Sequence, residues 1–368
     1  MTNLLRQFIF LTLAIILHWP LCLLIYTLGK TGIFKTVFLV YPTDEIEILG
    51  FCPNIRFFRN YIAGKTIPAG LIMNGWLPMG IYFVISDSPR ELAFKKNRHI
   101  AVSIVDNMHY YRKLAGAQTI GLAGQLGPIF SRRHNIPMDP PIFTSKNGNI
   151  FSIHEAINWV ARQEHTLRRK QNVAVIGGGD LGTTVQEYLI NQGYNCSITN
   201  VRYTIRGKVV PVQSDLEKKQ FRDIDYVINL MPKGEDFMAS GLEHTIPNNA
   251  AIIDFSRPPI SSDQLPQKVF MGNRVRRAGL RFVFALPGGW NQKELPACAL
   301  PSLIAAMTGR IDETLESFCL LARQQAFSTA LVDSQVTQQN VAPSFWDRFD
   351  FESENELAYG DDEGEIFT

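Results

Sequence analysis

The chain has 368 residues, of which 46% are hydrophobic and 19% charged, a composition that excludes an intrinsically disordered protein and predicts two folded domains. Its five cysteines form no C-x-x-C pair, so neither a disulfide scaffold nor a metal site is predicted. The formal charge of +2 conceals an asymmetry, because residues 346–368 carry −8 and the rest of the chain carries +10. The basic body favours an anionic partner, whereas no motif indicates nucleic-acid binding.

The N-terminal segment is the first candidate functional element. Residues 8–28 contain no Asp, Glu, Lys or Arg, and about 20 apolar residues are long enough to span a bilayer. Pro20 would kink such a helix, so a membrane span and a helix or shallow hairpin in the interface both remain open. A cleaved signal peptide is disfavoured, because no small-residue cleavage site follows. Lys30 and Lys35 favour a cytoplasmic position for the next domain, so residues 1–42 are predicted to attach the protein to the cytoplasmic face of a membrane.

Residues 43–165 are predicted to form a smaller α/β domain that binds the substrate. The apolar stretch from Ala69 to Ser86 contains Asn74 and Gly75, which indicates a buried strand and turn and not a second membrane span. A helix is predicted over residues 152–169, from the helical spacing of its apolar residues.

The clearest motif follows at residues 173–193. The apolar run Val173–Ile176 predicts a buried strand, and three glycines then fit G-x-G-x-x-G before a helical stretch that ends at Gly193. In this context the glycines permit a tight turn, a close approach to a pyrophosphate and packing of the helix on the strand. The sequence therefore predicts a Rossmann-type, doubly wound parallel sheet over residues 166–330. The expected cofactor contacts in the turn are Gly177, Gly179, Asp180, Leu181 and Gly182.

The segment after the second predicted strand indicates which dinucleotide binds. No Asp or Glu occurs over residues 195–208, where NAD sites usually carry an acid for the ribose 2′-hydroxyl. Arg202 and Arg206 lie there instead, and a guanidinium can bind a 2′-phosphate with two hydrogen bonds. NADPH is therefore the favoured cofactor, the alternative being that both arginines are ordinary surface charges.

Three further strands are predicted at residues 226–230, 250–254 and 281–285. Ligands of a doubly wound sheet bind at the carboxyl ends of its strands, so the loops that follow these strands are expected to wall the nicotinamide site. Met231 in the first loop is an expected cofactor contact, whereas Asp254 is expected to cap a turn. Beyond these strands and a returning helix, residues 331–368 are predicted to be an acidic, disordered tail.

Cys298 is the candidate nucleophile. Pro301 suits the first turn of a helix, and a thiol just before a helix N-terminus has its thiolate stabilised by the dipole and the free N–H groups. The alternative is that Cys298, flanked by alanines, is a small buried hydrophobic residue.

Several segments together resemble the cyanobacterial-type long-chain acyl-(acyl carrier protein) reductases. The resemblance covers about residues 65–310 and keeps the family's order, although the triple glycine and the N-terminal apolar segment depart from it. The matching segments are 121–130, 144–149, 173–182, Arg202, 252–254 and Ala297–Cys298. The resemblance implies that Cys298 takes up a fatty acyl group from acyl carrier protein or coenzyme A as a thioester. It also implies that NADPH reduces this thioester to a fatty aldehyde.

Two other functions remain open. One is an NADP-dependent dehydrogenase of a small polar substrate, resembling shikimate dehydrogenases, in which Cys298 would be dispensable and a Lys or Asp would line a polar cleft in the N-terminal domain. The other is a non-catalytic, membrane-tethered nucleotide-binding protein. The sequence predicts neither the acyl length, the oligomeric state nor the proton donor.

Overall fold

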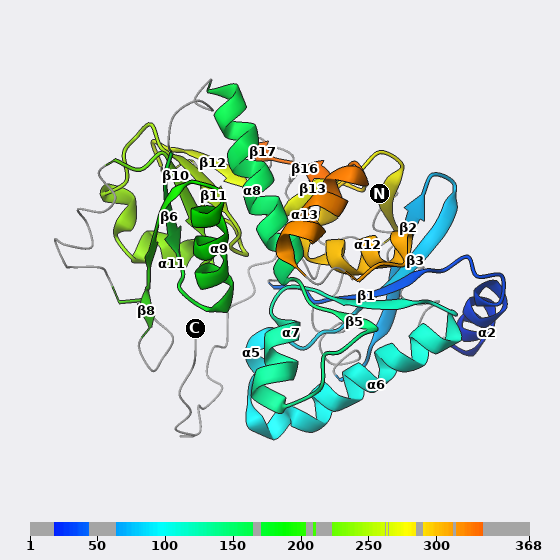
Figure 1. Cartoon of the computed structure of the whole chain (residues 1–368). Helices are drawn as coiled ribbons and strands as arrows, with labels where there is room; N and C mark the ends of the chain where they lie inside the picture. Colours follow the sequence, from blue (N-terminus) through cyan, green and yellow to red (C-terminus); the bar gives the residue numbers. More distant parts are fainter. Residues whose placement is uncertain are drawn as a thin grey trace, which may run out of the picture. The chain divides into compact units, whose positions relative to one another are not determined.

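A computed structural model describes most of the chain between residues 18 and 333 (Figure 1). The chain divides into two compact units, unit 1 (Met1–Glu164 and Gly272–Leu331) and unit 2 (His165–Met271 and Val332–Thr368). The described residues are 18–43, 64–164, 171–203, 209–210, 223–261, 263, 265–284, 290–311 and 314–333.

Unit 1 is built on a sheet that has six strands among its described residues. Their order across the sheet is β14 (Leu280–Phe284), β2 (Ile67–Asn74), β3 (Leu77–Val84), β1 (Thr36–Val40), β4 (Thr119–Leu122) and β5 (Ile142–Phe143). Strands β3, β1, β4 and β5 run parallel, whereas β2 is antiparallel to both β3 and β14. Strand β1 is buried along its whole length, as expected of a parallel strand covered on both faces, and its sequence is correspondingly apolar.

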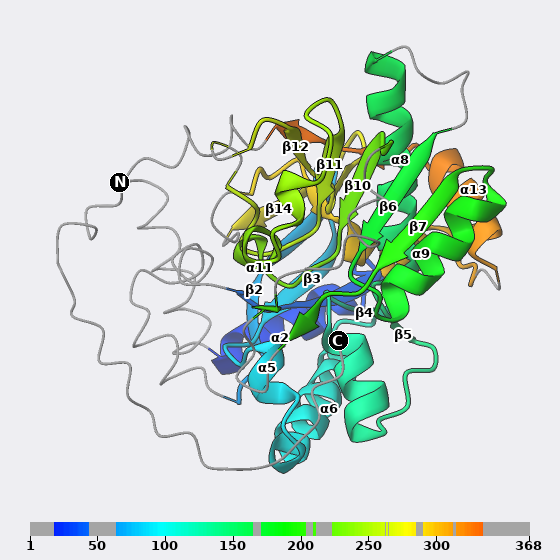
Figure 2. The same ribbon diagram turned by 90° about the vertical axis from the view of Figure 1, so that its left-hand side faces the viewer.

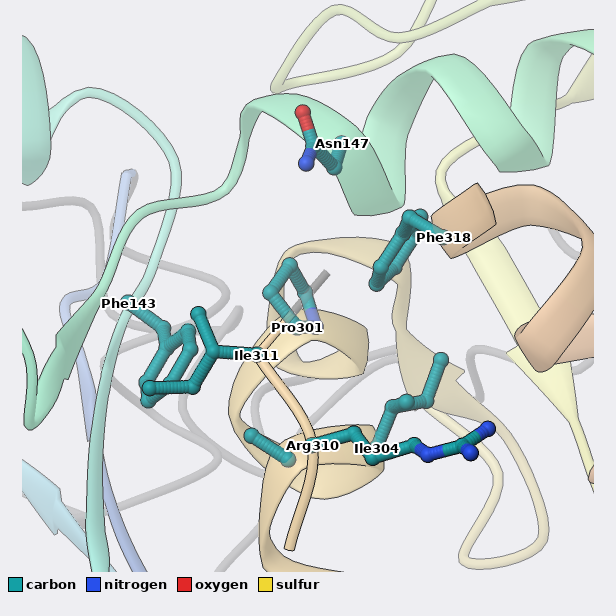
Figure 3. Close-up of a pocket in the computed structure, with 8 residues that line it drawn as sticks. Phe143, Asn147, Pro301, Ile304, Arg310, Ile311 and Phe318 are labelled. Atoms are coloured by element: carbon teal, nitrogen blue, oxygen red, sulfur yellow. The ribbon is translucent and has the colours of Figure 1, made fainter. Parts of the chain in front are cut away.

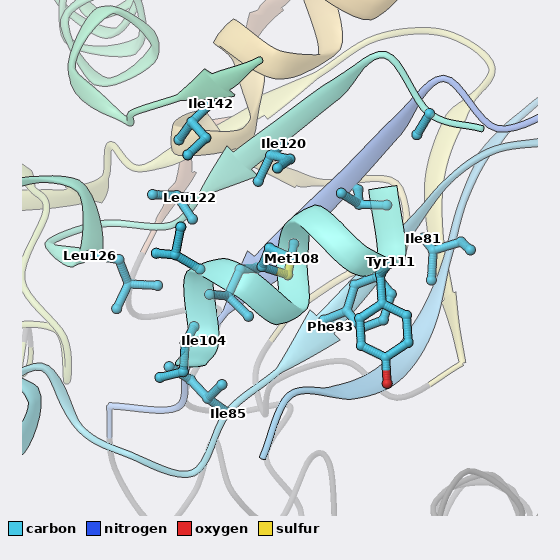
Figure 4. Packing of buried hydrophobic residues seen from close by; sticks show 14 of the residues in the cluster. Ile81, Phe83, Ile85, Ile104, Met108, Tyr111, Ile120, Leu122, Leu126 and Ile142 are labelled. Atoms are coloured by element: carbon cyan, nitrogen blue, oxygen red, sulfur yellow. The ribbon is translucent and has the colours of Figure 1, made fainter. Parts of the chain in front are cut away.

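Helix α6 (Arg98–Leu114) covers one face of this sheet (Figure 4). Its Ile104 and Met108 belong to the same buried cluster as Phe83 and Ile120 of the strands. Helix α2 (His18–Gly29) packs against α6 and adds Cys22 and Ile25 to the cluster.

The opposite face of the sheet is covered by α12 (Leu300–Thr308), which packs on β4 and β1. A side chain at Gly121 of β4 would collide with the Ser302 hydroxyl, and the Thr119 hydroxyl donates to the Ser302 carbonyl at 3.1 Å. Helices α8 (Lys146–Gln163) and α13 (Leu315–Gln324) pack against α12 and against each other. Unit 1 is therefore a sheet with helices on both faces.

Shorter elements complete unit 1. A three-stranded sheet has the order β15 (Leu295–Pro296), β13 (Arg274–Arg276), β16 (Ser328–Thr329) in the described part. The remaining described helical turns are α5 (Pro89–Leu92), η1 (Lys95–Asn97), α7 (Leu126–Pro128), η2 (Ile129–Arg133) and η5 (Ala297–Ala299).

Unit 2 contains a second sheet (Figure 2). Its described strands have the order β17 (Val332–Asp333), β12 (Lys268–Met271), β11 (Ala251–Asp254), β10 (Tyr226–Asn229), β6 (Asn172–Ile176) and β7 (Asn195–Thr199). All neighbours are parallel except β17, which runs antiparallel to β12. The other described elements are α9 (Asp180–Asn191), β8 (Arg202–Tyr203), β9 (Val209–Val210), α11 (Gly234–Ala239) and η3 (Leu242–His244).

The strand order of unit 2 creates a topological switch point at β6. The chain leaves β6 through α9 to β7 on one side, and it later returns to β10 on the other side of β6. In doubly wound sheets, ligands bind outside the carboxyl ends of the strands at such a point. The predicted strand–turn–helix–strand pattern over residues 173–201 and the predicted α/β class are thus confirmed.

The strand expected at residues 281–285 does not belong to the Rossmann sheet. It forms β14 of unit 1, antiparallel to β2, where the Phe282 ring stacks on Tyr82 with centroids 4.8 Å apart. The Tyr82 hydroxyl donates to the Val283 carbonyl at 3.1 Å. Because β2 offers a free edge and an apolar face, residues 272–331 return to unit 1, and the Rossmann unit ends its parallel sheet at β12 instead of extending over 166–330.

Other expectations have mixed outcomes. The stretch from Ala69 to Ser86 does form strands and a turn, and the helix expected at 152–169 begins earlier, at Lys146. None of the helices described by the structure has both the length and the apolar content needed to cross a bilayer. Residues 8–17 and 334–368 lie outside the described residues, and residues 332–333, expected in the tail, form β17.

Candidate functional site

The glycine turn after β6 has the geometry of a pyrophosphate cradle. Gly177 has φ +106°, a backbone conformation that favours glycine, and it lies against Leu230 at the end of β10. A Cβ atom at Gly182 would collide with the Gly177 carbonyl oxygen, so the first turn of α9 packs directly on the glycine turn. A side chain at either position would fill the space beside the helix start, so the residues present fit a bound dinucleotide.

The N-terminus of α9 supplies donors to the same place. Gly179 is its N-cap, with extended backbone and no side-chain capping bond, and the Thr183 N–H makes a helical bond to the Gly179 carbonyl at 3.0 Å. The N–H groups in the first turn of a helix have no carbonyl four residues earlier within that helix, and in α9 this applies to the expected contacts Leu181 and Gly182. Such N–H groups and the helix dipole bind phosphate.

Asn200 is a residue that sequence reasoning missed. It directly follows β7, and its side-chain oxygen lies where a Cβ atom at Gly178 would be. This is the place at which an NAD site would carry its ribose-binding acid. Arg202 lies two residues further on in β8, but its side chain and the whole of Arg206 are outside the described part of the chain.

The loops after β10 and β11 form one hydrogen-bonded wall. The buried Asp254 carboxylate accepts from the Asn229 side-chain amide at 2.8 Å and from the Ile260 N–H at 2.8 Å. It also accepts from the N–H and hydroxyl of Ser256. Burial raises the pKa of Asp254, against the opposing effect of these hydrogen bonds. Asp254 thus caps the loops, as expected.

Met231 is placed differently from the expectation. Its side chain is 2% exposed within the core of unit 2, and its N–H donates to the Asn229 side-chain oxygen at 3.2 Å. The Met231 side chain is therefore not available to contact a cofactor, because its thioether packs in the apolar core. The preceding residue, Leu230, is partly exposed and lies beside Gly177. The third expected wall, residues 286–289, lies outside the described residues.

In unit 1, Cys298 lies in the turn η5 directly before α12, and Pro301 is in the first turn of that helix, as predicted. Its neighbours Ala297 and Ala299 are completely buried, whereas Cys298 is partly exposed. The turn is tightly held, because the Ala297 N–H donates to the Asn273 carbonyl at 2.9 Å and the Ala297 carbonyl abuts Gly148 of α8. Packing leaves no room for a side chain at Gly148, so the first turn of α8 lies against η5.

A buried ion pair supports the same turn. Arg274 of β13 is 3% exposed, pairs with Glu294 and places its guanidinium 4.8 Å from the centroid of the Trp290 ring. Strand β13 pairs with β15, whose last residue Pro296 precedes η5. The turn that carries Cys298 is therefore held by strand pairing, a backbone hydrogen bond and a nearby ion pair.

The carboxyl ends of the parallel strands of unit 1 bring polar groups together. Tyr41 follows β1, and its hydroxyl accepts from the Gln125 N–H at 3.2 Å. The Ser145 hydroxyl, at the start of α8, donates to the Gly124 carbonyl at 2.8 Å. Tyr41 was not singled out from the sequence, and Ser145 was included only as part of the matching segment 144–149, because their proximity depends on the order of β1, β4 and β5.

A small cavity of about 90 Å³ lies on α12 beside this region (Figure 3). Its polar contributions come from Asn147 and Arg310, and the other walls are apolar. The lining residues are Phe143, Asn147, Pro301, Ile304, Ala305, Arg310, Ile311 and Phe318. Pro301 and Asn147 connect it to the start of α12 and to the first turn of α8, between which η5 packs.

The other described cysteines are less suited to chemistry. Burial raises the pKa of the Cys196 thiol on β7 to about 12, and it also raises the pKa of Cys22. Cys319 is buried in α13. No group of three or more His, Cys, Asp or Glu side chains that could hold a metal ion occurs among the residues the structure describes.

Comparisons with known proteins give only distant likenesses. No protein-family profile and no curated protein matches the chain. Among solved structures, the chain is similar to glutamate dehydrogenase from Peptoniphilus asaccharolyticus, with 12% identity over 80% of this chain and 76% of that one and a TM-score of 0.37. It is also similar to shikimate 5-dehydrogenase from Thermus thermophilus in complex with NADP(H) and shikimate, with 15% identity over 79% and 100% and a TM-score of 0.33.

Other similar structures are matched over less of their length. The chain spans 60% of a dipicolinate synthase from Bacillus halodurans, with 14% identity, 43% coverage of this chain and a TM-score of 0.27. It spans 52% of an NADPH-dependent glyoxylate/hydroxypyruvate reductase from Sinorhizobium meliloti. All four TM-scores are below 0.5, and the Rossmann assignment of unit 2 rests on its strand order, parallel register and glycine turn.

Proposed function

We propose that the protein is an NADPH-dependent reductase that converts a long-chain acyl thioester to a fatty aldehyde through a thioester on Cys298. The observation that carries the proposal is the position of Cys298, partly exposed in a turn held between the starts of α8 and α12. Helix N-termini favour a thiolate, and a thiolate is the nucleophile that acyl transfer requires. The family resemblance over residues 65–310 points to the same residue.

Unit 2 would hold the cofactor. Gly177, Gly179 and Gly182 would receive the pyrophosphate together with the N–H groups at the start of α9. Arg202 and Arg206 would bind the 2′-phosphate, since no acid stands at the end of β7 to repel it. Bound NADPH would supply a hydride to the acyl thioester.

The thiol would carry the acyl group in two steps. The Cys298 thiol loses its proton and its sulfur attacks the carbonyl carbon of the acyl thioester. A new C–S bond forms, the bond to the carrier sulfur breaks, and the carrier thiolate takes up one proton in place of the one that Cys298 lost, so that it leaves as a thiol. After hydride addition, the C–S bond to Cys298 breaks, the aldehyde leaves, and the sulfur returns to its starting state. Dividing the reaction in this way replaces one difficult step by two easier ones. Backbone N–H groups of residues 298–302 are candidates for stabilising the oxyanion.

The substrate carrier is either acyl carrier protein or coenzyme A. Both are acidic, and the chain without its last 23 residues carries a formal charge of +10, which would accelerate their encounter. The proposal requires that the acyl group on Cys298 and the nicotinamide meet in the functioning enzyme.

The test is an aldehyde assay with purified full-length protein, NADPH and a long-chain acyl-CoA or acyl carrier protein. Wild type is expected to form fatty aldehyde, and Cys298→Ser is expected to lose at least about a thousandfold in rate while still binding NADPH. Cys319→Ser is the matched control, because this cysteine is buried in α13. Undiminished aldehyde formation by Cys298→Ser would remove the mechanism.

A second candidate function is supported by the polar groups at the carboxyl edge of the unit 1 sheet. Tyr41 and Ser145 place two hydroxyl groups there, which would suit a small polar substrate of an NADP-dependent dehydrogenase. That function predicts no activity on acyl thioesters, and it predicts that the protein oxidises NADPH in the presence of small keto compounds. This NADPH oxidation should be retained in Cys298→Ser and lost in Tyr41→Phe. Binding of NADPH without turnover of either substrate class would instead indicate a nucleotide-binding protein without catalysis.

A further inference from the structure

Helix α2 lacks the polar face that surface helices normally have. Its sequence from His18 to Gly29 contains no Asp, Glu, Lys or Arg, and its only strongly polar side chains are His18 at its start and Thr27, so it has no charged face and is apolar over most of its surface. One side is buried, because Cys22 and Ile25 pack in the core of unit 1. Gly29 packs closely on α6, since a Cβ atom at Gly29 would lie 2.7 Å from the backbone of Ala115. A helix that is apolar all round is ordinarily buried all round or in contact with lipid.

The other side of α2 is exposed and carries large apolar groups. Trp19 is 82% exposed, Leu23 65%, Leu24 54% and Tyr26 43%. Trp19, Leu23 and Tyr26 follow each other at intervals of four and three residues, so they form one stripe along the helix. Contiguous exposed apolar surface of this kind marks an interaction site.

The charges around α2 favour an anionic occupant. Residues 1–43 contain no Asp or Glu, and the Lys30 ammonium lies 4.5 Å from the centroid of the Tyr26 ring. The close approach of Gly29 to Ala115 brings the end of α2 to the last turn of α6, which carries Arg112 and Lys113. Trp19 at the start of the apolar helix and Tyr26 beside Lys30 at its end give the residue composition typical of a membrane interface.

We propose that the stripe formed by Trp19, Leu23, Leu24 and Tyr26 is a lipid-binding surface, which holds unit 1 in the headgroup region of an anionic bilayer. The ten residues that precede α2, Phe8 to Leu17, are also uncharged, so the apolar sequence continues into the helix. A second copy of the chain is a poorer occupant, because the bases beside α2 would repel their counterparts and attract anionic lipid. Because one side of α2 packs on the core of unit 1, the helix would lie along the membrane surface and would not cross the bilayer. The proposal goes beyond the reductase function and does not depend on it.

Vesicle sedimentation with the full-length protein tests this proposal. Wild type is expected to bind vesicles of phosphatidylcholine with about 30% phosphatidylserine, and to bind pure phosphatidylcholine vesicles at least about tenfold less. The variant Trp19→Ser/Leu23→Ser/Tyr26→Ser is expected to partition at least about tenfold more weakly into the anionic vesicles. The matched control is Ile190→Ser/Leu320→Ser, which removes exposed apolar side chains from α9 and α13 and should leave binding unchanged.

A second measurement does not depend on the folding of the triple variant. Brominated lipids are expected to quench tryptophan fluorescence in the wild type, and this quenching should fall in Trp19→Phe. Vesicle binding by the triple variant at the wild-type level, or quenching that Trp19→Phe leaves unchanged, would overturn the proposal. Dimerisation of the wild type in sedimentation velocity, abolished in the triple variant and unaffected by lipid, would assign the stripe to a second copy and would also overturn it.

Discussion

The carbonyl oxygen of Gly177 occupies the space that a side chain at Gly182 would need. This contact ties the start of α9 to the turn after β6, and it places the N–H groups of the helix beside the switch point of the unit 2 sheet. The proposed binding of NADPH by unit 2 would depend on this contact, because a pyrophosphate can approach the helix start only when no side chain intervenes.

Gly182→Ala is therefore expected to weaken NADPH binding at least about tenfold, equivalent to roughly 1.4 kcal/mol. It should also lower the free energy of unfolding by about 1–3 kcal/mol, because the turn and helix must separate to admit the methyl group. Asn191→Ala is the control, since it changes an exposed side chain at the other end of α9. Calorimetric titration with NADPH measures the first effect and urea unfolding the second. Equal affinity in wild type and Gly182→Ala would contradict a pyrophosphate at this turn.

Asn200→Asp is expected to shift cofactor preference from NADPH towards NADH by about tenfold or more. The new carboxylate would follow β7 beside Gly178, where it would repel a 2′-phosphate and accept from a ribose hydroxyl. Asn195→Asp adds the same charge at the exposed start of β7 and should leave the preference unchanged. The ratio of the two dissociation constants is the measurement. An unchanged ratio in Asn200→Asp would place the ribose elsewhere.

Cys298 is expected to be alkylated by iodoacetamide faster than Cys196. Because burial raises the pKa of Cys196 to about 12, only about one in ten thousand of its thiols is ionised at pH 8. Cys298 is similarly exposed but lies directly before the N-terminus of α12, a position that favours the thiolate. Peptide mapping after timed alkylation scores each cysteine separately, and loss of aldehyde formation should follow the labelling of Cys298. Preferential labelling of Cys196 would contradict both its raised pKa and the proposed role of Cys298.

Asp254→Ala is expected to lower the free energy of unfolding by about 2–4 kcal/mol. The substitution leaves the buried donors of Asn229, Ser256 and Ile260 without their acceptor. Asp263→Ala removes an exposed carboxylate from the segment that follows β11 and should cost less than about 0.5 kcal/mol. Urea unfolding of the three proteins gives the comparison. A cost for Asp254→Ala no larger than the control would show that these hydrogen bonds add little to stability.

The buried His154 side chain is expected to make the free energy of unfolding of unit 1 fall at acidic pH. Burial, reinforced by Arg323 at 3.0 Å, lowers the pKa of His154 from 6.5 to about 4. The unfolded chain therefore binds a proton at His154 more readily than the folded chain does. The contribution of neutral His154 to the free energy of unfolding is complete above pH 6.5 and is lost as the pH falls towards 4. The loss is on the order of 3 kcal/mol.

The slope of unfolding free energy against pH tests this assignment. His154→Gln should be less sensitive between pH 6.5 and 4 than the wild type, because the residue no longer titrates. His244→Gln, whose side chain is 84% exposed in the wild type, should keep the wild-type slope. A slope that is the same in all three proteins would assign the acid sensitivity to other groups.

Local features of both units could be predicted from the sequence. The glycine spacing after Val173–Ile176 requires a tight turn and a closely packed helix, and Pro301 suits only the beginning of a helix, so these elements form where they were expected. Such features depend on backbone dihedral angles and on close approach between neighbours in the chain, which the residue types themselves determine.

Only the tertiary structure decided which sheet each apolar strand joins and which groups meet at its edge. The run 281–285 would suit either sheet, and it pairs with β2 because Tyr82 and Gly70 of unit 1 provide a matching surface. Met231 became core, and Tyr41 and Ser145 came together, through the order of strands distant in sequence. Burial and strand pairing depend on partners far along the chain, whereas composition and spacing report only on neighbours.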